Sequence, residues 1–163
     1  NLIIDHLGGK EPINTWLRAR GIDGLTFHGP IDFSNDSGFA TATTDALVAV
    51  ASLLDLDGTL SSNAVTWARD VLFRQQHTLF LSRHLPHSYH AADFGFELPL
   101  RAYTKHGAFP GVVADVGLFE TATATWAIAA IGNDTNDLIG SPDEAGPIRL
   151  AEIGQAAYTT WTT

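Results

Sequence analysis

The 163-residue chain contains no cysteine and no methionine, and it has few basic residues. The absence of cysteine excludes disulfides, thiolate metal ligands and a cysteine nucleophile. Only nine lysines and arginines stand against 18 aspartates and glutamates, so the formal net charge is -9. This balance argues against binding to nucleic acid, which needs a basic surface, and against docking on anionic lipid. No apolar run is long enough to predict a segment that spans a membrane.

What the chain does contain is a globular composition, with 45% hydrophobic and 17% charged residues. That composition excludes a disordered, collagen-like or coiled-coil chain and fits one compact domain. Residues 1–98 are predicted to be mostly helical, whereas residues 99–163 contain three adjacent strand patterns and a terminal helix. This order predicts an α+β fold with an antiparallel meander.

The first part of the chain shows helix periodicity between recognisable stop signals. Gly8-Gly9 and Gly21 suit the left-handed ends of the first two helices, and Pro12 suits the first turn of the second. Residues 24–41 have no sustained period and are rich in turn residues, which predicts a long irregular loop. The predicted helices cover residues 2–7, 12–21, 43–58, 61–72 and, as a short segment closed by Pro86, 79–85.

The second part of the chain changes to strand composition. Valine, threonine, isoleucine and aromatic residues favour strands, and they predict strands at residues 100–107, 112–120 and 123–131. A polar loop should follow over residues 133–146. Pro147 is predicted to begin the terminal helix, which continues to Trp161.

Three histidines, His84, His87 and His90, follow one another at a spacing of three. A helix could bring two of them together as metal ligands. However, Pro86 interrupts the run, and Asp93 is the only nearby carboxylate that could complete a site. A solvated, histidine-rich loop is therefore the preferred interpretation, and no metal site is predicted. The chain also lacks a glycine-rich phosphate loop and an HExxH motif.

A more specific pattern runs through residues 101–118, RAYTKHGAFPGVVADVGL. A predicted strand carries Lys105, Gly107 follows two residues later, and Pro110-Gly111 leads into a second strand. This arrangement resembles the Lys-Thr/Ser-Gly strand of class A β-lactamases and penicillin-binding serine hydrolases.

The resemblance covers nearly the whole chain. Residues 1–9 are similar to the helix that follows the family's Ser-Asp-Asn motif, and residues 13–21 are similar to the helix after it. Further matching segments lie at residues 43–47, 58–61 and 75–86. By this resemblance, residues 1–163 are the C-terminal portion of one β-lactamase/transpeptidase-like domain, an antiparallel sheet flanked by helices. The three strands would join two more from an N-terminal part, the partner that this sequence lacks.

The resemblance also implies a chemistry and a site. In this family a serine attacks a carbonyl to form an acyl-enzyme, and no cofactor takes part. By position, Lys105 would supply positive potential for developing negative charge, and the Ala108 backbone N–H would be one oxyanion donor. Gly107 would let a small-molecule or peptidyl substrate approach the strand, and His106 would contact a substrate carboxylate. Relatives are commonly exported, so a periplasmic or extracellular location is expected.

The sequence departs from the family pattern at three places. No Ser-x-x-Lys and no Ser-Asp-Asn occur, because Leu7 and Ala102 stand three residues before the two lysines. His106 stands where relatives carry a hydroxyl residue, and an imidazole is larger and titrates near neutral pH. This chain alone therefore lacks the nucleophile.

The third departure concerns residues 27–39, which lack the Glu-x-x-Leu-Asn pattern that carries the deacylating glutamate of class A β-lactamases. Asp32 and Asp36 are the only acids there. Efficient β-lactam hydrolysis is therefore not expected, whereas acyl transfer on a β-lactam, ester or peptide carbonyl is. The alternative is a non-catalytic binding or accessory domain on the same scaffold.

Overall fold

The structure is a computed structural model that describes residues 1–32, 38–55, 59–137 and 141–162. The chain divides into two compact units, residues 1–50 and residues 51–163. The sequence-based division at residue 98 remains a prediction. Within the described residues, no helix is both long and apolar enough to cross a membrane.

The first unit contains two helices and a small sheet before a third helix leads into the second unit. The glycines at the predicted helix ends have positive φ, +84° at Gly8, +97° at Gly9 and +70° at Gly21, which L residues with a side chain rarely adopt. The predicted stops are therefore confirmed. The elements are α1 (Leu2–His6), α2 (Lys10–Arg18), β1 (Leu25–Phe27), β2 (Ala40–Ala42) and α3 (Thr44–Ser52).

The loop predicted for residues 24–41 was only partly right, because its two ends pair as the antiparallel strands β1 and β2. Asn14 of α2 explains how so short a strand is held. Its side-chain amide donates to the carbonyl of Phe27 at 2.8 Å and accepts from the N–H of Phe27 at 2.8 Å. Asn1 makes the same two contacts with Ile31, at 2.9 and 2.6 Å. These tertiary contacts supply what the local sequence pattern lacks.

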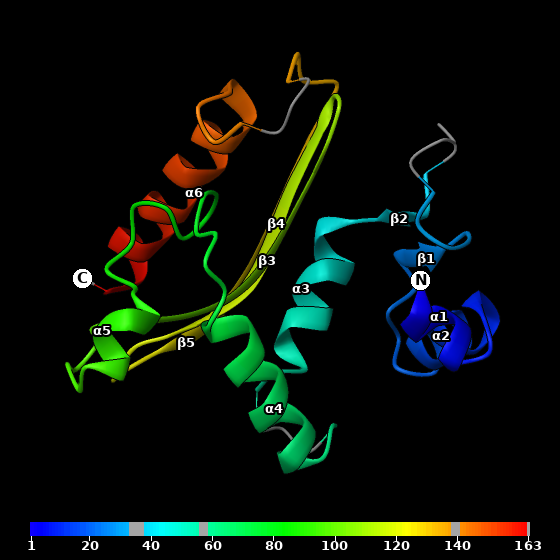
Figure 1. Cartoon of the computed structure of the whole chain (residues 1–163), viewed down its shortest axis with the longest axis horizontal. Coiled ribbons are helices and arrows are strands. Elements are labelled where there is room, and N and C mark those ends of the chain that lie inside the picture. The colour runs from blue at the N-terminus through cyan, green and yellow to red at the C-terminus, as the bar shows by residue number, and fades with distance from the viewer. Residues whose placement is uncertain (33–37, 56–58, 138–140, 163) are drawn as a thin grey trace. The chain divides into compact units, whose positions relative to one another are not determined.

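The second unit is a three-stranded antiparallel sheet in the order β3-β4-β5, with helices on both faces (Figure 1). Its elements are α4 (Ser62–Phe73), α5 (Tyr89–Asp93), β3 (Arg101–Phe109), β4 (Val112–Glu120), β5 (Thr125–Asn133) and α6 (Ala145–Thr162). The predicted meander is confirmed, with β4 at its predicted residues. Strand β3 begins one residue and β5 two residues later than predicted, and both end two residues later. Helix α6 begins at Ala145, two residues before the predicted Pro147.

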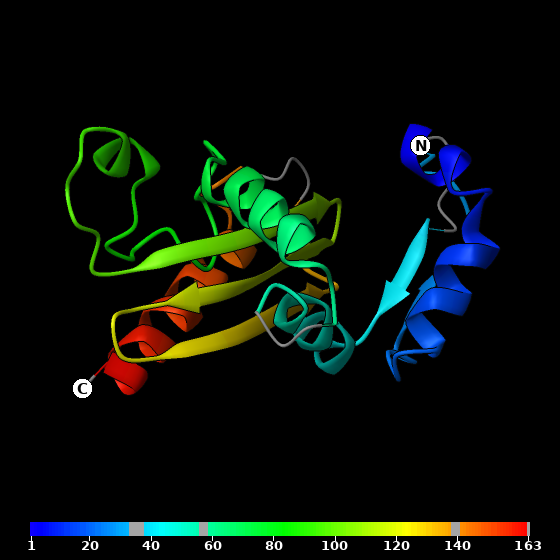
Figure 2. The ribbon, with the colours of Figure 1, turned by 90° about the horizontal axis from the view of Figure 1, so that it is seen from below.

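The two faces of this sheet carry separate apolar clusters, because successive side chains of a strand point to opposite faces. Helix α6 covers one face, and α4 lies on the other, as the two views show (Figures 1 and 2). The α6-side cluster includes Phe80, Leu81 and Phe119. The α4-side cluster contains Phe73, Tyr103 and Leu118. Successive residues of β3 therefore face the two clusters alternately.

The segment between α4 and β3 differs from the prediction. Residues 79–85 form turns rather than a short helix, and the helix of this segment is α5, which the sequence did not reveal. A tertiary contact holds the segment, since the N–H of Leu81 donates to the side chain of Asp115 on β4 at 3.0 Å. The helix predicted over residues 43–58 corresponds to α3, which ends at Ser52, and its predicted end at residues 57–58 lies outside the described residues.

Candidate acyl-transfer site on strand β3

The predicted site residues are four consecutive positions of β3, which forms one edge of the described sheet. In antiparallel pairs, the backbone N–H and C=O of a residue face the same side, and this side alternates along the strand. The N–H of Ala102 donates to Nδ1 of His87, outside the sheet, at 3.1 Å. Pairing with β4 is continuous from Arg101 to Phe109, so the alternation continues without a bulge.

It follows that Thr104, His106 and Ala108 direct their backbone groups to the edge that β4 does not occupy. The Ala108 N–H, which the resemblance marks as an oxyanion donor, is therefore an edge donor. Ala108 is also exposed. A backbone N–H held by a paired strand is a preorganised donor, because it needs no reorientation when negative charge develops beside it.

Lys105 and Gly107 lie on the opposite side chain face of β3 from His106. The Lys105 side chain is exposed, and its ammonium donates to the carbonyl of His106, which is a second edge-directed group. Gly107 borders open space, because a Cβ added there would meet no atom within 4 Å. Packing therefore does not require a glycine at this position, and the absence of a side chain leaves the strand accessible.

His106 is half-buried and stacks on Phe80, with 4.6 Å between ring centroids and an interplanar angle of 18°. Burial lowers the pKa of His106, and the positive charges of Lys105 and His77 lower that pKa further. The imidazole is consequently uncharged near neutral pH. A neutral imidazole offers one donor and one acceptor, so its interaction with a carboxylate is hydrogen bonding rather than charge pairing at that pH.

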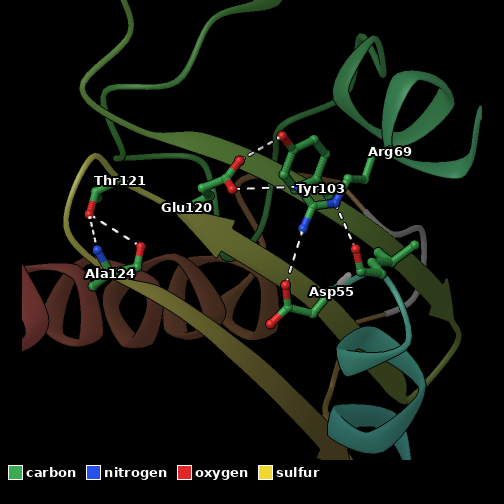
Figure 3. A network of polar contacts seen from close by, with 7 residues as sticks. Asp55, Arg69, Tyr103, Glu120, Thr121 and Ala124 are labelled. Carbon is green, nitrogen blue, oxygen red and sulfur yellow. Dashed lines mark hydrogen bonds and ion pairs between the residues drawn. The ribbon is translucent and has the colours of Figure 1, made fainter. Parts of the chain in front are cut away.

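A polar network lies on the Lys105 side of the sheet and is centred on Arg69 of α4 (Figure 3). The Arg69 guanidinium lies 3.5 Å from a carboxylate oxygen of Glu120 and 3.7 Å from one of Asp55. Its Nε donates to the carbonyl of Leu54 at 2.6 Å. The Tyr103 hydroxyl donates to Glu120 at 3.1 Å. The network joins α4 to β3 and β4, and so it fixes the strand that carries Lys105.

Sequence reasoning missed Asp115, which is only 2% exposed and lies on β4 directly opposite His106. Burial raises the pKa of Asp115 to about 7, although the N–H groups of Leu81 and Val116 and the charge of Lys105 act against the rise. The available signal was its place in the apolar strand Val112–Glu120, where an acid must face the interior or break the pattern.

The three histidines considered as metal ligands take separate environments. His87 accepts the N–H of Ala102 and packs edge-on against Phe73, with 5.2 Å between centroids. His90 lies against Tyr89, and His84 is exposed. Over the part of the chain that the structure describes, no three acidic, histidine or cysteine residues are grouped to hold a metal ion. Of the two loop acids, Asp32 is exposed and Asp36 lies outside the described residues.

An antiparallel sheet between helices is the architecture of the β-lactamase/transpeptidase fold, and solved structures of that fold match nearly the whole chain. The chain belongs to the β-lactamase enzyme family, whose family model matches residues 1–161. A search of curated proteins found no significant match.

Solved structures agree with this assignment. The β-lactamase from Sphaerobacter thermophilus DSM 20745 is 25% identical, with a TM-score of 0.78 over 98% of this chain and 55% of that one. PBP-A is 19% identical, with a TM-score of 0.73 over 98% of this chain and 54% of its own. The chromosome-encoded β-lactamase of Vibrio parahaemolyticus is 15% identical, with a TM-score of 0.75 over 99% of this chain and 58% of its own. The chain therefore spans little more than half the length of these neighbours.

Proposed function

We propose that the chain is part of a serine acyl-transfer hydrolase that acts on a β-lactam, ester or peptide carbonyl through an acyl-enzyme. The observation that carries this proposal is the edge of β3. There the Ala108 N–H faces outward, Gly107 leaves open space and Lys105 is exposed beside them. Family membership supplies the reaction class.

In this proposal each β3 residue has a separate role. A serine oxygen attacks the substrate carbonyl, and the carbonyl oxygen gains negative charge as the carbon becomes tetrahedral. The Ala108 N–H donates to that oxygen, and the Lys105 ammonium stabilises the charge electrostatically. Gly107 permits the substrate to lie along the strand edge. Collapse of the tetrahedral species breaks the bond from the carbonyl carbon to the leaving group, the proton lost by the serine hydroxyl passes to the leaving group, and the acyl group stays on the serine.

The serine would come from the N-terminal part of the same domain, which is the partner proposed for this chain. The length of the solved neighbours supports that proposal, because the chain spans 54–58% of them. Two apolar side chains at the start of the chain are also strongly exposed within the first unit, Leu2 at 86% and Ile3 at 76%. A complementary part would remove this apolar surface from water.

We further propose that the complete domain is not an efficient β-lactamase. The described part of residues 27–39 offers Asp32 as its acid and contains no glutamate. Without a positioned base to activate water, an acyl-enzyme formed from a β-lactam persists. A non-catalytic binding or accessory domain is the second candidate. Its support is His106, which replaces the hydroxyl residue of relatives and is held against Phe80.

Substitution of Lys105 tests the proposal in the complete domain. Lys105→Ala should reduce the rate of acylation by a fluorescent penicillin about 10²-fold, the usual effect of one transition-state electrostatic group. The free energy of unfolding should change little, because the side chain is exposed. Gel fluorescence or intact mass, followed over time, measures the acylation rate.

Arg101→Ala is the matched control, because Arg101 is another exposed cation on the same side chain face of β3. It should acylate at close to the wild-type rate. Equal rates for Lys105→Ala and the wild type would contradict the assigned role of Lys105. A wild-type protein that binds penicillin reversibly without gaining mass would instead support the binding-domain candidate.

A further inference from the structure

The buried carboxyl group of Asp115 lies within the same layer as His106. The two residues are directly opposite on β4 and β3, so their side chains project from the same sheet face. Asp115 does not lie free in this layer, because its Oδ2 accepts the N–H of Leu81 at 3.0 Å. A buried carboxyl group that bonds one backbone amide fixes the position of that peptide.

The Leu81 peptide is also held from the opposite direction, by helix α6. A Cβ added to Gly154 would lie 1.9 Å from the carbonyl oxygen of Leu81, so the helix backbone already lies against the carbonyl of the residue whose N–H Asp115 accepts. Leu81 is completely buried. The segment therefore lies between a side chain of the sheet and a glycine of the helix. Its own backbone bonds are two turns, from the N–H of Arg83 to the carbonyl of Phe80 at 3.0 Å and from Leu85 to Ser82 at 3.1 Å.

Phe80 precedes Leu81 and is 1% exposed. Its ring is the surface on which the His106 imidazole stacks. The position of the imidazole thus depends on Phe80, and the position of Phe80 depends on the peptide that Asp115 holds. This chain of contacts leads from the interior of the sheet to the β3 residue that follows Lys105.

We propose that Asp115 is a positioning residue for the acyl-transfer site, acting through Leu81 and Phe80 to set the orientation of the His106 imidazole. The inference rests on the proposed function, because it assigns His106 a role in substrate recognition. A neutral imidazole held at this position selects carboxylate-bearing or hydrogen-bonding substrates by geometry rather than by net positive charge.

The titration of His106 provides a readout that does not depend on activity. Lys105 on the same strand, His77 from the segment after α4, and Asp115 on β4 are the titratable groups that act on the imidazole or face it. Histidine-labelled protein, followed by NMR over pH 4–9, reports the pKa of His106 and the ring-current shift from Phe80. Both quantities should respond when the stacking is lost.

Two substitutions at Asp115 separate positioning from charge. Asp115→Asn keeps an oxygen that accepts from Leu81, and it should leave the His106 pKa close to the wild-type value. Asp115→Ala removes the acceptor, so the His106 pKa should rise toward the ordinary histidine value of about 6.5. If Asp115 acted only by its negative charge, both variants would instead lower that pKa, and the proposal would be overturned.

Phe80→Leu gives a second test that does not disturb the Asp115–Leu81 hydrogen bond. It should raise the His106 pKa as Asp115→Ala does, and it decides the question if the alanine variant fails to fold. An unchanged His106 pKa in Phe80→Leu would overturn the proposal. Acylation kinetics separate this inference from the proposed function. A wild-type domain that is never acylated contradicts the proposed function alone, while the NMR titrations still test the positioning role.

Discussion

The two faces of the β3-β4-β5 sheet handle their charged groups in opposite ways. On the α4 face, Arg69 and Glu120 are partly exposed and bond to each other, to Tyr103 and to the backbone (Figure 3). On the α6 face, Asp115 is almost completely buried beside an apolar cluster that includes Leu81, Val113 and Phe119. The charges on the α4 face are therefore paired and still reach solvent, whereas the Asp115 carboxyl group accepts one backbone N–H at Oδ2.

This difference shows that the same sheet separates two tasks. The α4 face ties α4 to the strands by charge pairing that tolerates water. The α6 face is closely packed, and the carboxyl group of Asp115 bonds a turn rather than a cation. Perturbations of the α6 face should therefore cost more stability and depend more on pH than equivalent changes on the α4 face.

The largest effect is expected from Gly154→Ala on the α6 face. Because the added Cβ would lie 1.9 Å from the backbone oxygen of Leu81, either the helix or the turn must move. The expected loss in the free energy of unfolding is about 3 kcal/mol or more, measured by urea denaturation. Gly107→Ala is the control, because its Cβ would meet nothing within 4 Å, and it should change stability by less than about 0.5 kcal/mol. Equal effects would contradict the close packing of α6.

The next largest effect is a pH-dependent gain in the free energy of unfolding from Asp115→Asn. The pKa of the folded carboxyl is raised to about 7, whereas an unfolded aspartate ionises near 4. The folded state thus binds one more proton between these values, and wild-type stability falls as pH rises from 5 to 7. The stability of Asp115→Asn relative to wild type should therefore increase by about 2–3 kcal/mol as the pH rises from 5 to 8.

Denaturant titrations at the two pH values measure this gain, and an unchanged slope with denaturant would show that the unfolded state is the same. A stability difference that stays constant with pH would contradict the raised pKa of Asp115. The α4 face offers no comparable buried carboxyl group among the residues the structure describes.

A smaller effect is expected from Glu120→Gln on the α4 face. The change removes one charge from the network, but Arg69 keeps Asp55 and the Leu54 carbonyl. The expected loss is about 1 kcal/mol and should decrease at high salt. Glu152→Gln, in an exposed pair with Arg149, is the control and should cost less than about 0.5 kcal/mol. A loss that does not respond to salt would show that shape, not charge, holds this face together.

The smallest effect concerns ligand binding at His106. Burial, Lys105 and His77 lower the pKa of His106. The imidazole therefore adds a positive charge to that of Lys105 only at a pH below the ordinary histidine pKa of about 6.5. Affinity for a carboxylate-bearing ligand should therefore rise roughly two- to fivefold as pH falls below that value. His106→Thr should remove this rise, as measured by calorimetry at each pH. The same rise in the threonine variant would assign it to another group.

Much of the architecture could be predicted because its signals are local. The strand at Val112–Glu120 was predicted at its observed residues, since its valines and Phe119 favour a strand after the Pro110-Gly111 turn. The turn at residues 79–85 was misjudged as a helix, because its apolar content is local but its hydrogen-bond acceptor, Asp115, is 34 residues away. For the same reason, the short strands β1 and β2 were missed, because Asn14 reaches Phe27 from another element.

The candidate site likewise has features that the local sequence predicts and features that depend on tertiary contacts. The order of Lys105, His106, Gly107 and Ala108 is a property of the sequence, and so is the strand that carries them. Which of their backbone groups face the open edge, and which face β4, depended on the register with β4 and on His87. The sequence by itself determined the elements and the family pattern, because propensity and spacing act over a few residues. Only the tertiary structure decided the pairing of Arg69, the burial of Asp115 and the uncharged state of His106, because those depend on groups that folding brings together.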